Sequence, residues 1–225
     1  QNVGIEIIPL DELGTIVKAL SFLVSQNPQE IYQLTGLDNK HTASTTTHVP
    51  VDLGNNNLYP YMLCNIGSGV SILHVNSKDD YKRVSGTALG GGTFFGLAKL
   101  LTKLKSFKEC MEEAAVGDET TVNMLVKDIY GGRYGLELPG DFTASFFGKV
   151  GGSKGSGQAE DGVDQNDNNS NGGGSSQATK IADDGGNSPS PANADLCRAL
   201  VVMITQNIAQ IALLNAVIHG CPRVI

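Results

Sequence analysis

A low-complexity segment in the second half of the chain, Gly151 to Ala194, constrains the fold more than any other feature. It is built mainly from Gly, Ser, Asn, Asp and Gln and contains almost no large apolar residue. Such a composition buries too little apolar surface to offset the entropy lost on ordering, so we expect disorder there. A long, largely apolar helix is predicted from Leu196 to His219. The core must therefore come from residues 1–150 and 195–225, with residues 151–194 inserted between them.

The first third of the chain predicts a helix followed by strands. Apolar residues recur at helical spacing from Leu10 to Val24, and Asp11 and Glu12 lie in the first turn, where the helix dipole favours anions. The polar stretch from Gln26 to Asn57 predicts a long loop with one short strand near Ile31–Tyr32. Three strands are predicted at residues 59–66, 70–75 and 81–85, the first two as a hairpin around Gly67-Ser68-Gly69.

Three helices are predicted after the strands, at residues 94–104, 106–115 and 121–129. The second helix opens with Ser106 and Glu109, which have the spacing of a capping box. The third is expected to be capped by Asp118 and to stop at Gly131. Strands and helices in one chain predict the α/β class.

Charge and cysteine content narrow the function classes. The 16 basic and 23 acidic residues give a net charge of -7 without a basic cluster, so we expect no nucleic-acid partner. A triphosphate can still be held by backbone N–H groups and a metal ion. The four cysteines lack paired or zinc-like spacing, which indicates buried thiols in a reducing compartment. No apolar run reaches the roughly 18 residues of a membrane span, so we expect no membrane partner.

Two glycine-rich motifs are candidates for phosphate binding. In Asn65 to Ser71, glycines let backbone N–H groups face inward and two serines add donors, but an ordinary hairpin turn also fits. In Gly86 to Thr93, glycines precede a helix whose first N–H groups suit phosphate, and a flexible connector fits as well. No Gly-Lys-Ser/Thr follows, so this is not a Walker A loop. The candidate phosphate-loop residues are Gly67, Gly69, Gly90, Gly91, Gly92 and Thr93.

Two charged residues are candidates for the chemistry itself. Arg83 ends a strand just before the second glycine motif, where it could clamp an anionic or carbonyl group, or be an ordinary surface arginine. Glu12 could be a general base, although helix-start electrostatics alone also explain a carboxylate there. The four histidines have no spacing for metal or triad chemistry, so no metal ligands are predicted.

Taken together, five ordered blocks resemble the eukaryotic-type (type II) pantothenate kinases, within the superfamily of sugar kinases, actin and the chaperone ATPases. The resemblance covers the chain apart from residues 151–194 and the loop before Leu58. The blocks are Leu10-Asp11-Glu12-Leu13, Asn65 to Leu73, Ser77 to Val84, Gly86 to Phe94 and Val126 to Gly132.

The resemblance implies an actin-like, sugar-kinase ATPase domain of the ribonuclease H-like type, incomplete in this chain. It implies that Glu12 is the catalytic base. The implied contacts to pantothenate and, in competition, to acyl-CoA are Ser68, Ser71 and Arg83. It also implies a homodimer in which Thr143 and Ala144 form a segment that closes the partner's pantothenate pocket.

The function implied by the resemblance is phosphorylation of pantothenate to 4'-phosphopantothenate with Mg-ATP, the first step of coenzyme A biosynthesis. We expect a cytoplasmic enzyme with acyl-CoA as feedback inhibitor. The family's Asp-Ile-Gly-Gly loop would precede Gln1 and its Gly-Asn-Phe segment would follow Ile225. The chain is therefore expected to be an inactive fragment of an active kinase. Two alternatives are a pseudokinase that binds acyl-CoA or nucleotide without turnover, and a related kinase with another hydroxyl substrate.

Overall fold

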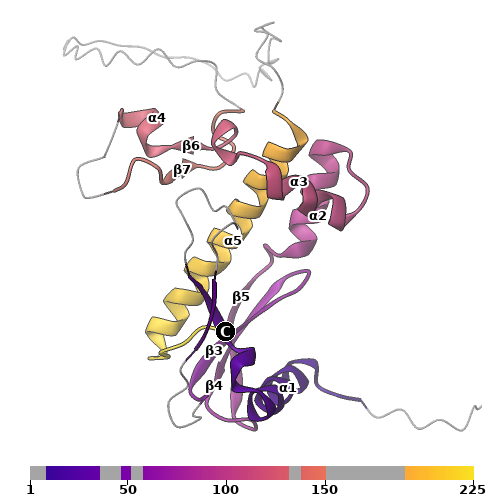
Figure 1. The fold of residues 1–225 in the computed structure, drawn as a ribbon, viewed down its shortest axis with the longest axis vertical. Coiled ribbons are helices and arrows are strands. Elements are labelled where there is room, and N and C mark those ends of the chain that lie inside the picture. The colour runs from indigo at the N-terminus through magenta and orange to yellow at the C-terminus, as the bar shows by residue number, and fades with distance from the viewer. Residues whose placement is uncertain (1–8, 36–46, 52–57, 132–137, 151–190) are drawn as a thin grey trace, which may run out of the picture. The chain divides into compact units, whose positions relative to one another are not determined.

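The computed structural model describes residues 9–35, 47–51, 58–131, 138–150 and 191–225 (Figure 1). The chain divides into two compact units. The first comprises Gln1–Glu112 with Leu200–Ile225, and the second comprises Glu113–Ala199. Most of the segment expected to be disordered, residues 151–190, lies outside the described residues. Helices and strands occur together, which agrees with a mixed α and β fold, while the actin-like type stays a prediction.

A three-stranded antiparallel sheet forms the centre of the first unit. Its order is β3-β4-β5, with β3 at Tyr61–Ile66, β4 at Val70–Val75 and β5 at Tyr81–Thr87. The predicted hairpin and third strand are therefore confirmed. Tyr61 and Leu73 are buried on one face, and Met62 and Ile72 on the other. Because alternate residues of a strand point to opposite faces, both faces must be covered.

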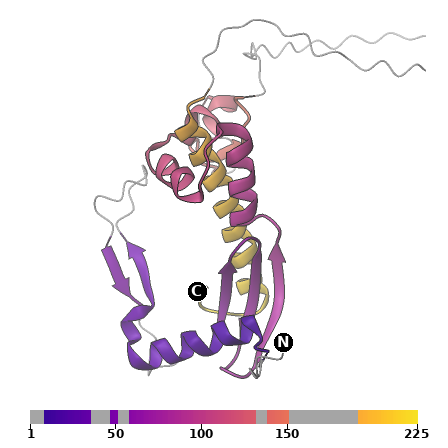
Figure 2. The same ribbon diagram turned by 90° about the vertical axis from the view of Figure 1, so that its right-hand side faces the viewer.

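Helix α1 (Glu12–Gln26) covers one of these faces (Figure 2). Its periodic apolar residues Val17 and Val24 are buried in the same cluster as sheet residues, which confirms the predicted amphipathic helix. The sheet residues of this cluster are Tyr61, Leu63, Leu73 and Val75. Asp11 caps the helix, its side chain accepting a hydrogen bond from the Gly14 N–H at 2.9 Å. Leu13 and Ile16 pack against the same cluster, so the apolar contact begins in the first turn of the helix.

The segment after α1 holds a short hairpin in addition to the single strand expected there. A 3-10 turn, η1 (Pro28–Glu30), leads into β1 (Tyr32–Thr35), which pairs with β2 (Thr47–Pro50). β1 confirms the strand predicted near Tyr32, whereas β2 was expected to be loop. β2 is exposed along its whole length, so it lacks the buried alternation that would have predicted it.

Helix α5 (Asn193–Ile218) covers the second face of the sheet with its C-terminal half (Figures 1 and 2). It begins slightly earlier than predicted. Its buried residues in the first unit recur every four positions: Leu200, Ile204, Ile208, Ala212 and Ala216. After α5 the chain turns back, and Val224 forms a parallel bridge to Met62. The Met62 N–H donates to the Arg223 carbonyl at 2.9 Å, so β3 is also paired on the edge away from β4.

By length and composition, α5 also qualifies as a membrane-crossing helix, with a mean hydropathy of 1.7. The sequence predicted no membrane span because no uninterrupted apolar run is long enough, and that criterion passed over a helix in which polar residues are interspersed. The core helices of soluble proteins meet the same criterion, so the finding by itself favours neither setting.

Helices α2 (Gly91–Thr102) and α3 (Phe107–Val116) follow the sheet. The predicted capping box at the start of α3 is confirmed. The Glu109 N–H donates to Ser106 Oγ at 3.1 Å, and the Ser106 N–H donates to the Glu109 carboxylate at 3.1 Å. Phe94 of α2 meets Phe107 of α3 edge to face, with ring centroids 5.4 Å apart.

The second unit confirms only the second half of the helix predicted at residues 121–129, since the helix found there begins at Val126. Asp118 caps only a 3-10 turn, by accepting a hydrogen bond from the Thr120 N–H at 2.9 Å. Asn123 is buried and accepts a hydrogen bond from the Phe147 N–H at 3.0 Å, which holds the chain in a non-helical course. The elements found here are η3 (Glu119–Thr121), β6 (Met124–Leu125), α4 (Val126–Tyr130) and β7 (Thr143–Ser145). Gly131, at φ 70°, ends α4 as predicted.

Candidate functional site

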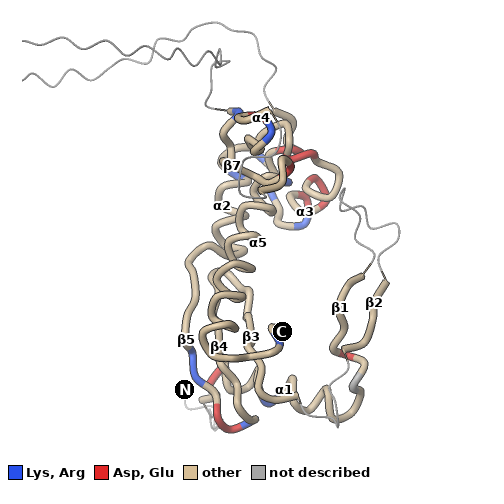
Figure 3. The backbone as a smooth tube through the Cα atoms, turned by 90° about the vertical axis from the view of Figure 1, so that its left-hand side faces the viewer, with Lys and Arg blue, Asp and Glu red and all other residues tan. Residues whose placement is uncertain are grey.

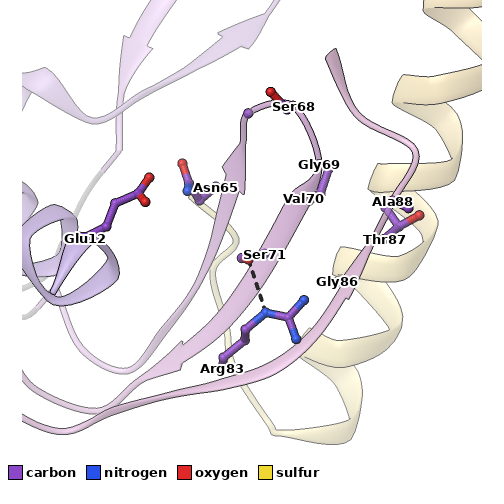
Figure 4. Close-up of a pocket in the computed structure, with 11 residues that line it drawn as sticks. Glu12, Asn65, Ser68, Gly69, Val70, Ser71, Arg83, Gly86, Thr87 and Ala88 are labelled. Carbon is purple, nitrogen blue, oxygen red and sulfur yellow. Dashed lines mark hydrogen bonds between the residues drawn. The ribbon is translucent and has the colours of Figure 1, made fainter. Parts of the chain in front are cut away.

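A polar pocket of about 610 Å³ opens in the first unit, at the N-terminal end of α1 and beside the β3–β4 turn (Figure 4). It is lined by Glu12, Asn65, Gly67, Ser68, Gly69, Val70, Ser71, Arg83, Gly86, Thr87 and Ala88. The predicted base, both serines and the arginine thus line one hollow, although they come from three separate sequence blocks. The hollow contains a carboxylate, a guanidinium and several hydroxyls, a set suited to a polar substrate with an anionic group.

A row of residues across the three strands forms the floor of this pocket. Asn65 pairs with Ser71, and Ser71 pairs with Gly86. The register of β4 and β5 then shifts, because Ile72 pairs with Ser85 but Leu73 pairs with Arg83. A β-bulge of this kind adds one residue to one strand and reverses the facing of those beyond it. Arg83 therefore shares the pocket face with Gly86 although the two are three residues apart.

The guanidinium of Arg83 is held in place by two neighbours. Arg83 Nε donates a hydrogen bond to Ser71 Oγ at 3.1 Å, as Figure 4 shows. Gly86 leaves the space that the guanidinium occupies, because a Cβ at that position would collide with Arg83 and with the carbonyl oxygen of Val70. Lys82 and Arg83 follow the acidic turn Asp79–Asp80, so β5 carries the basic charge nearest the pocket (Figure 3).

Glu12 occupies the first helical position of α1, directly after the capping residue Asp11. It is exposed, and Figure 4 shows its carboxylate directed from α1 toward the strands, facing the Asn65 side chain. A carboxylate of this placement can accept a proton from a group bound over the strand row. Ser68, in contrast, lies at the tip of the β3–β4 turn, well separated from Arg83 in the same view.

The glycines at the start of α2 make different contacts from those expected. The sequence predicted unpaired N–H groups here, but those of Gly90, Gly91 and Gly92 donate to the carbonyls of Ala88, Gly67 and Ser68 at 3.2, 2.8 and 3.0 Å. The expectation is wrong for these three groups. The β3–β4 turn packs on the start of α2 and its carbonyls accept the bonds from Gly91 and Gly92, while Gly90 bonds within its own loop. The Thr93 hydroxyl likewise donates to the Ala88 carbonyl, at 2.9 Å. Phosphate binding by this loop stays a prediction.

Thr143 and Ala144 lie in the second unit. Thr143 pairs with Leu125 between β7 and β6, and Ala144 is exposed. Their predicted role beside a partner's pocket stays a prediction. Among the residues that the structure describes, no three His, Cys, Asp or Glu side chains are grouped to hold a metal ion. No described side chain is therefore assigned to a metal.

The sequence of the whole chain matches a known family. A sequence model of the family described as Fumble matches residues 1–225. The chain belongs to the Fumble family. The resemblance to pantothenate kinases is thereby confirmed, since relatives of this Fumble chain carry that name.

Three relatives define what this Fumble chain is similar to. Pantothenate kinase 1 of Arabidopsis thaliana is 37% identical over 226 residues, which are 100% of this chain and 49% of the relative. Pantothenate kinase 2 of the same plant is 35% identical over 226 residues, 100% of this chain and 21% of the relative. The 4'-phosphopantetheine phosphatase of Mus musculus is 33% identical over 215 residues, 95% of this chain and 21% of the relative. The chain thus spans half or less of the length of the curated relatives it matches.

Sequence reasoning missed Asn65 as an individual member of the site. The residue was part of a glycine motif, yet its amide lines the pocket between Glu12 and the turn. Strand alternation carried the signal, because Tyr61, Leu63 and Asn65 must share a face once the strand is predicted. A polar residue ending an otherwise apolar face marks the point where that face leaves the core.

Proposed function

We propose that the protein containing this chain phosphorylates pantothenate with ATP to give 4'-phosphopantothenate. The family and the names of its relatives support a kinase of coenzyme A biosynthesis. The single observation that carries the proposal is the pocket in which Glu12 lines the same hollow as the Arg83–Ser71 pair. Pantothenate has a carboxylate for the guanidinium and a terminal hydroxyl for the base, which suits such a pocket.

In the proposed reaction, Glu12 accepts the proton of the terminal hydroxyl of pantothenate. The hydroxyl oxygen forms a new bond to the γ-phosphorus of ATP, and the bond from that phosphorus to the bridging oxygen breaks, so that ADP leaves with the electron pair. Arg83 and Ser71 hold the rest of the substrate and orient it for in-line attack. Phosphoryl transfer from ATP usually uses a divalent cation, and Mg²⁺ would neutralise charge on the phosphates.

Several wider properties belong to the same proposal. An actin-like ATPase fold would place the nucleotide beside this pocket in the complete protein. Acyl-CoA contains the pantothenate skeleton, so the same Arg83–Ser71 pair would bind it in competition with substrate. A homodimer would bring Thr143 and Ala144 of one copy to the pocket of the other. We further propose a cytoplasmic location.

The test is a phosphate-transfer assay on the complete polypeptide, with pantothenate compared against a panel of small alcohols. Replacing Glu12 by Gln keeps the size of the side chain but removes the base, so kcat should fall by about 10²- to 10⁴-fold. Binding of ATP, measured by calorimetry, should be unchanged. Wild-type turnover in Glu12→Gln would refute the role of Glu12, and a preference for another alcohol would refute the substrate.

A second candidate function is binding without phosphorylation, because a relative that aligns with 95% of this chain is named a phosphatase. In a protein of that kind this region need not transfer phosphate. The same assay separates the two functions. Tight binding of pantothenate or acyl-CoA with no ATP-dependent product in the wild-type protein would favour the binding role.

A further inference from the structure

One tyrosine hydroxyl joins the sheet to the first turn of α1, next to the pocket. Tyr81 OH donates a hydrogen bond to Asp11 Oδ2 at 2.8 Å. The same oxygen accepts the Gly14 N–H at 2.9 Å, which is the capping bond of the helix. Tyr81 is half-buried on β5 and packs at the edge of the cluster beneath α1. A residue of β5 therefore supports the cap that begins α1.

The contact leaves no room for a Cβ at position 14 unless the Tyr81 or Asp11 side chain moves. A Cβ on Gly14 would collide with the Tyr81 hydroxyl and would lie 2.6 Å from Asp11 Oδ2. Gly14 is buried in the first turn of α1, where its N–H receives the capping bond. Close approach of the hydroxyl gives a physical reason for that residue. The hydrogen bonds from the Tyr81 hydroxyl and the Gly14 N–H hold the pKa of Asp11 below its ordinary value, which agrees with an ionised carboxylate accepting both bonds.

Glu12 follows Asp11 and is the first residue with helical geometry. The first turn of a helix lacks intrahelical partners for its N–H groups, so its position depends on the cap. Tyr81 and Arg83 are two residues apart on the same face of β5, where they pair with Val75 and Leu73 of β4. Strand β5 therefore carries the guanidinium of Arg83 itself. Through the bond from Tyr81 to Asp11, it also holds the backbone that carries the carboxylate of Glu12.

We propose that Tyr81 is a positioning residue for the proposed phosphotransfer, acting through Asp11 to hold Glu12 at the pocket. The inference rests on the proposed function, because the role of Glu12 does. Tyr81 itself touches no reacting group in this scheme. Its loss should therefore reduce the rate of the chemical step and leave binding of pantothenate in place.

The test compares Tyr81→Phe with a matched control in the complete enzyme. Tyr81→Phe keeps the ring and removes the hydroxyl, and we expect kcat to fall about tenfold with an unchanged KM for pantothenate, because small misplacements can cost up to about a hundredfold in rate. The control is Tyr59→Phe, since the Tyr59 hydroxyl also ties α1 down, through Ser21, but in the middle of the helix. The control should keep wild-type kcat and KM.

Two further variants separate positioning from charge. Asp11→Asn retains a side-chain oxygen that can accept both bonds, so it should keep most of the activity, whereas Asp11→Ala should behave like Tyr81→Phe. Combining Asp11→Ala with Tyr81→Phe should cost no more than either change alone. Wild-type kcat in Tyr81→Phe, or an equal loss in Tyr59→Phe, would overturn the inference.

A crystal structure of Tyr81→Phe supplies a readout that needs no turnover. We expect the Asp11 side chain to leave its cap and the Glu12 carboxylate to move or lose order. An unchanged first turn of α1 would refute the positioning role, even if the wild-type enzyme proved inert toward pantothenate. Inert wild-type enzyme with a displaced Glu12 in the variant would refute the proposed function alone.

Discussion

Gly86→Ala is the sharpest perturbation of the candidate site, because the pocket floor leaves no room for a methyl group at this position. The added Cβ would collide with the carbonyl oxygen of Val70 on β4 and with the guanidinium of Arg83. The carbonyl belongs to the sheet backbone and can move little, while the arginine is an exposed, flexible side chain. We therefore expect Arg83 to swing away from Ser71, and the two strands to separate slightly.

The magnitude follows from these two responses. A hydrogen bond to a charged group contributes about 1.5–3 kcal/mol, and the exposure of Arg83 favours the lower end of that range. Since about 1.4 kcal/mol corresponds to a tenfold change, kcat/KM for pantothenate should fall about tenfold, mainly through KM. Overpacking at the strand pair should cost about 1–3 kcal/mol of unfolding free energy, offset in part by about 0.4–1 kcal/mol from the stiffer unfolded chain.

The assay is steady-state kinetics with varied pantothenate, together with thermal unfolding of the same preparations. Gly96→Ala is the matched control, because Gly96 lies within α2 and no atom beyond the backbone of its own helix comes within 4 Å of its added Cβ. That control should leave KM unchanged and raise the stability by about 0.5–1 kcal/mol. Wild-type KM and an undiminished unfolding temperature in Gly86→Ala would refute the inferred crowding.

Two further predictions concern stability. Leu73 is fully buried beneath α1, so Leu73→Ala should lower the unfolding free energy by about 2–5 kcal/mol in denaturant titration. Leu100 is 80% exposed, so Leu100→Ala should change the unfolding free energy by less than about 0.5 kcal/mol, and equal losses would contradict the assigned core. The pKa of Asp128 is held below its ordinary value of 3.8, first by Lys149, whose Nζ lies 2.7 Å from Asp128 Oδ2, and second by the Leu125 N–H. These contacts stabilise the folded state above pH 3.8, and the stabilisation is lost as the pH falls through the folded-state pKa. In Asp128→Asn, the unfolding temperature should fall less steeply as the pH is lowered below 3.8. An unchanged dependence on pH would contradict the role of Asp128.

Local patterns predicted the elements whose formation depends on neighbours in the sequence. α1 shows helical periodicity behind a capping aspartate, α3 carries its own capping box, and the strands from β3 to β5 alternate around short turns. In each case the sequence within a few residues decides the conformation. The same reasoning failed at residues 121–125, where buried Asn123 accepts a hydrogen bond from the backbone of Phe147. A contact between residues so far apart leaves no local pattern.

The site was predictable in its residues and unpredictable in its geometry. Family resemblance supplied Glu12, Ser71 and Arg83, and the structure places all three around one pocket. The bulge that turns Arg83 onto the pocket face could not be predicted, since the sequence of β5 alternates no differently there. The partners of the Gly91 and Gly92 N–H groups were equally hidden, because they are carbonyls of a turn more than twenty residues earlier.

The face of the sheet beneath α1 is divided between two tasks. At one end Tyr61 and Val75 pack against the helix, and at the other Asn65 and Ser71 meet the pocket. The same strands run from one end to the other. The apolar contact therefore determines the position of α1 on the sheet, and the polar end supplies the residues that the first turn of α1 faces. Truncation of the apolar side chains at the first end should therefore appear mainly as lost stability. Damage to the polar end should appear as altered kcat or KM in a protein that still folds, and this division follows from α1 lying across the sheet with its first turn at the pocket.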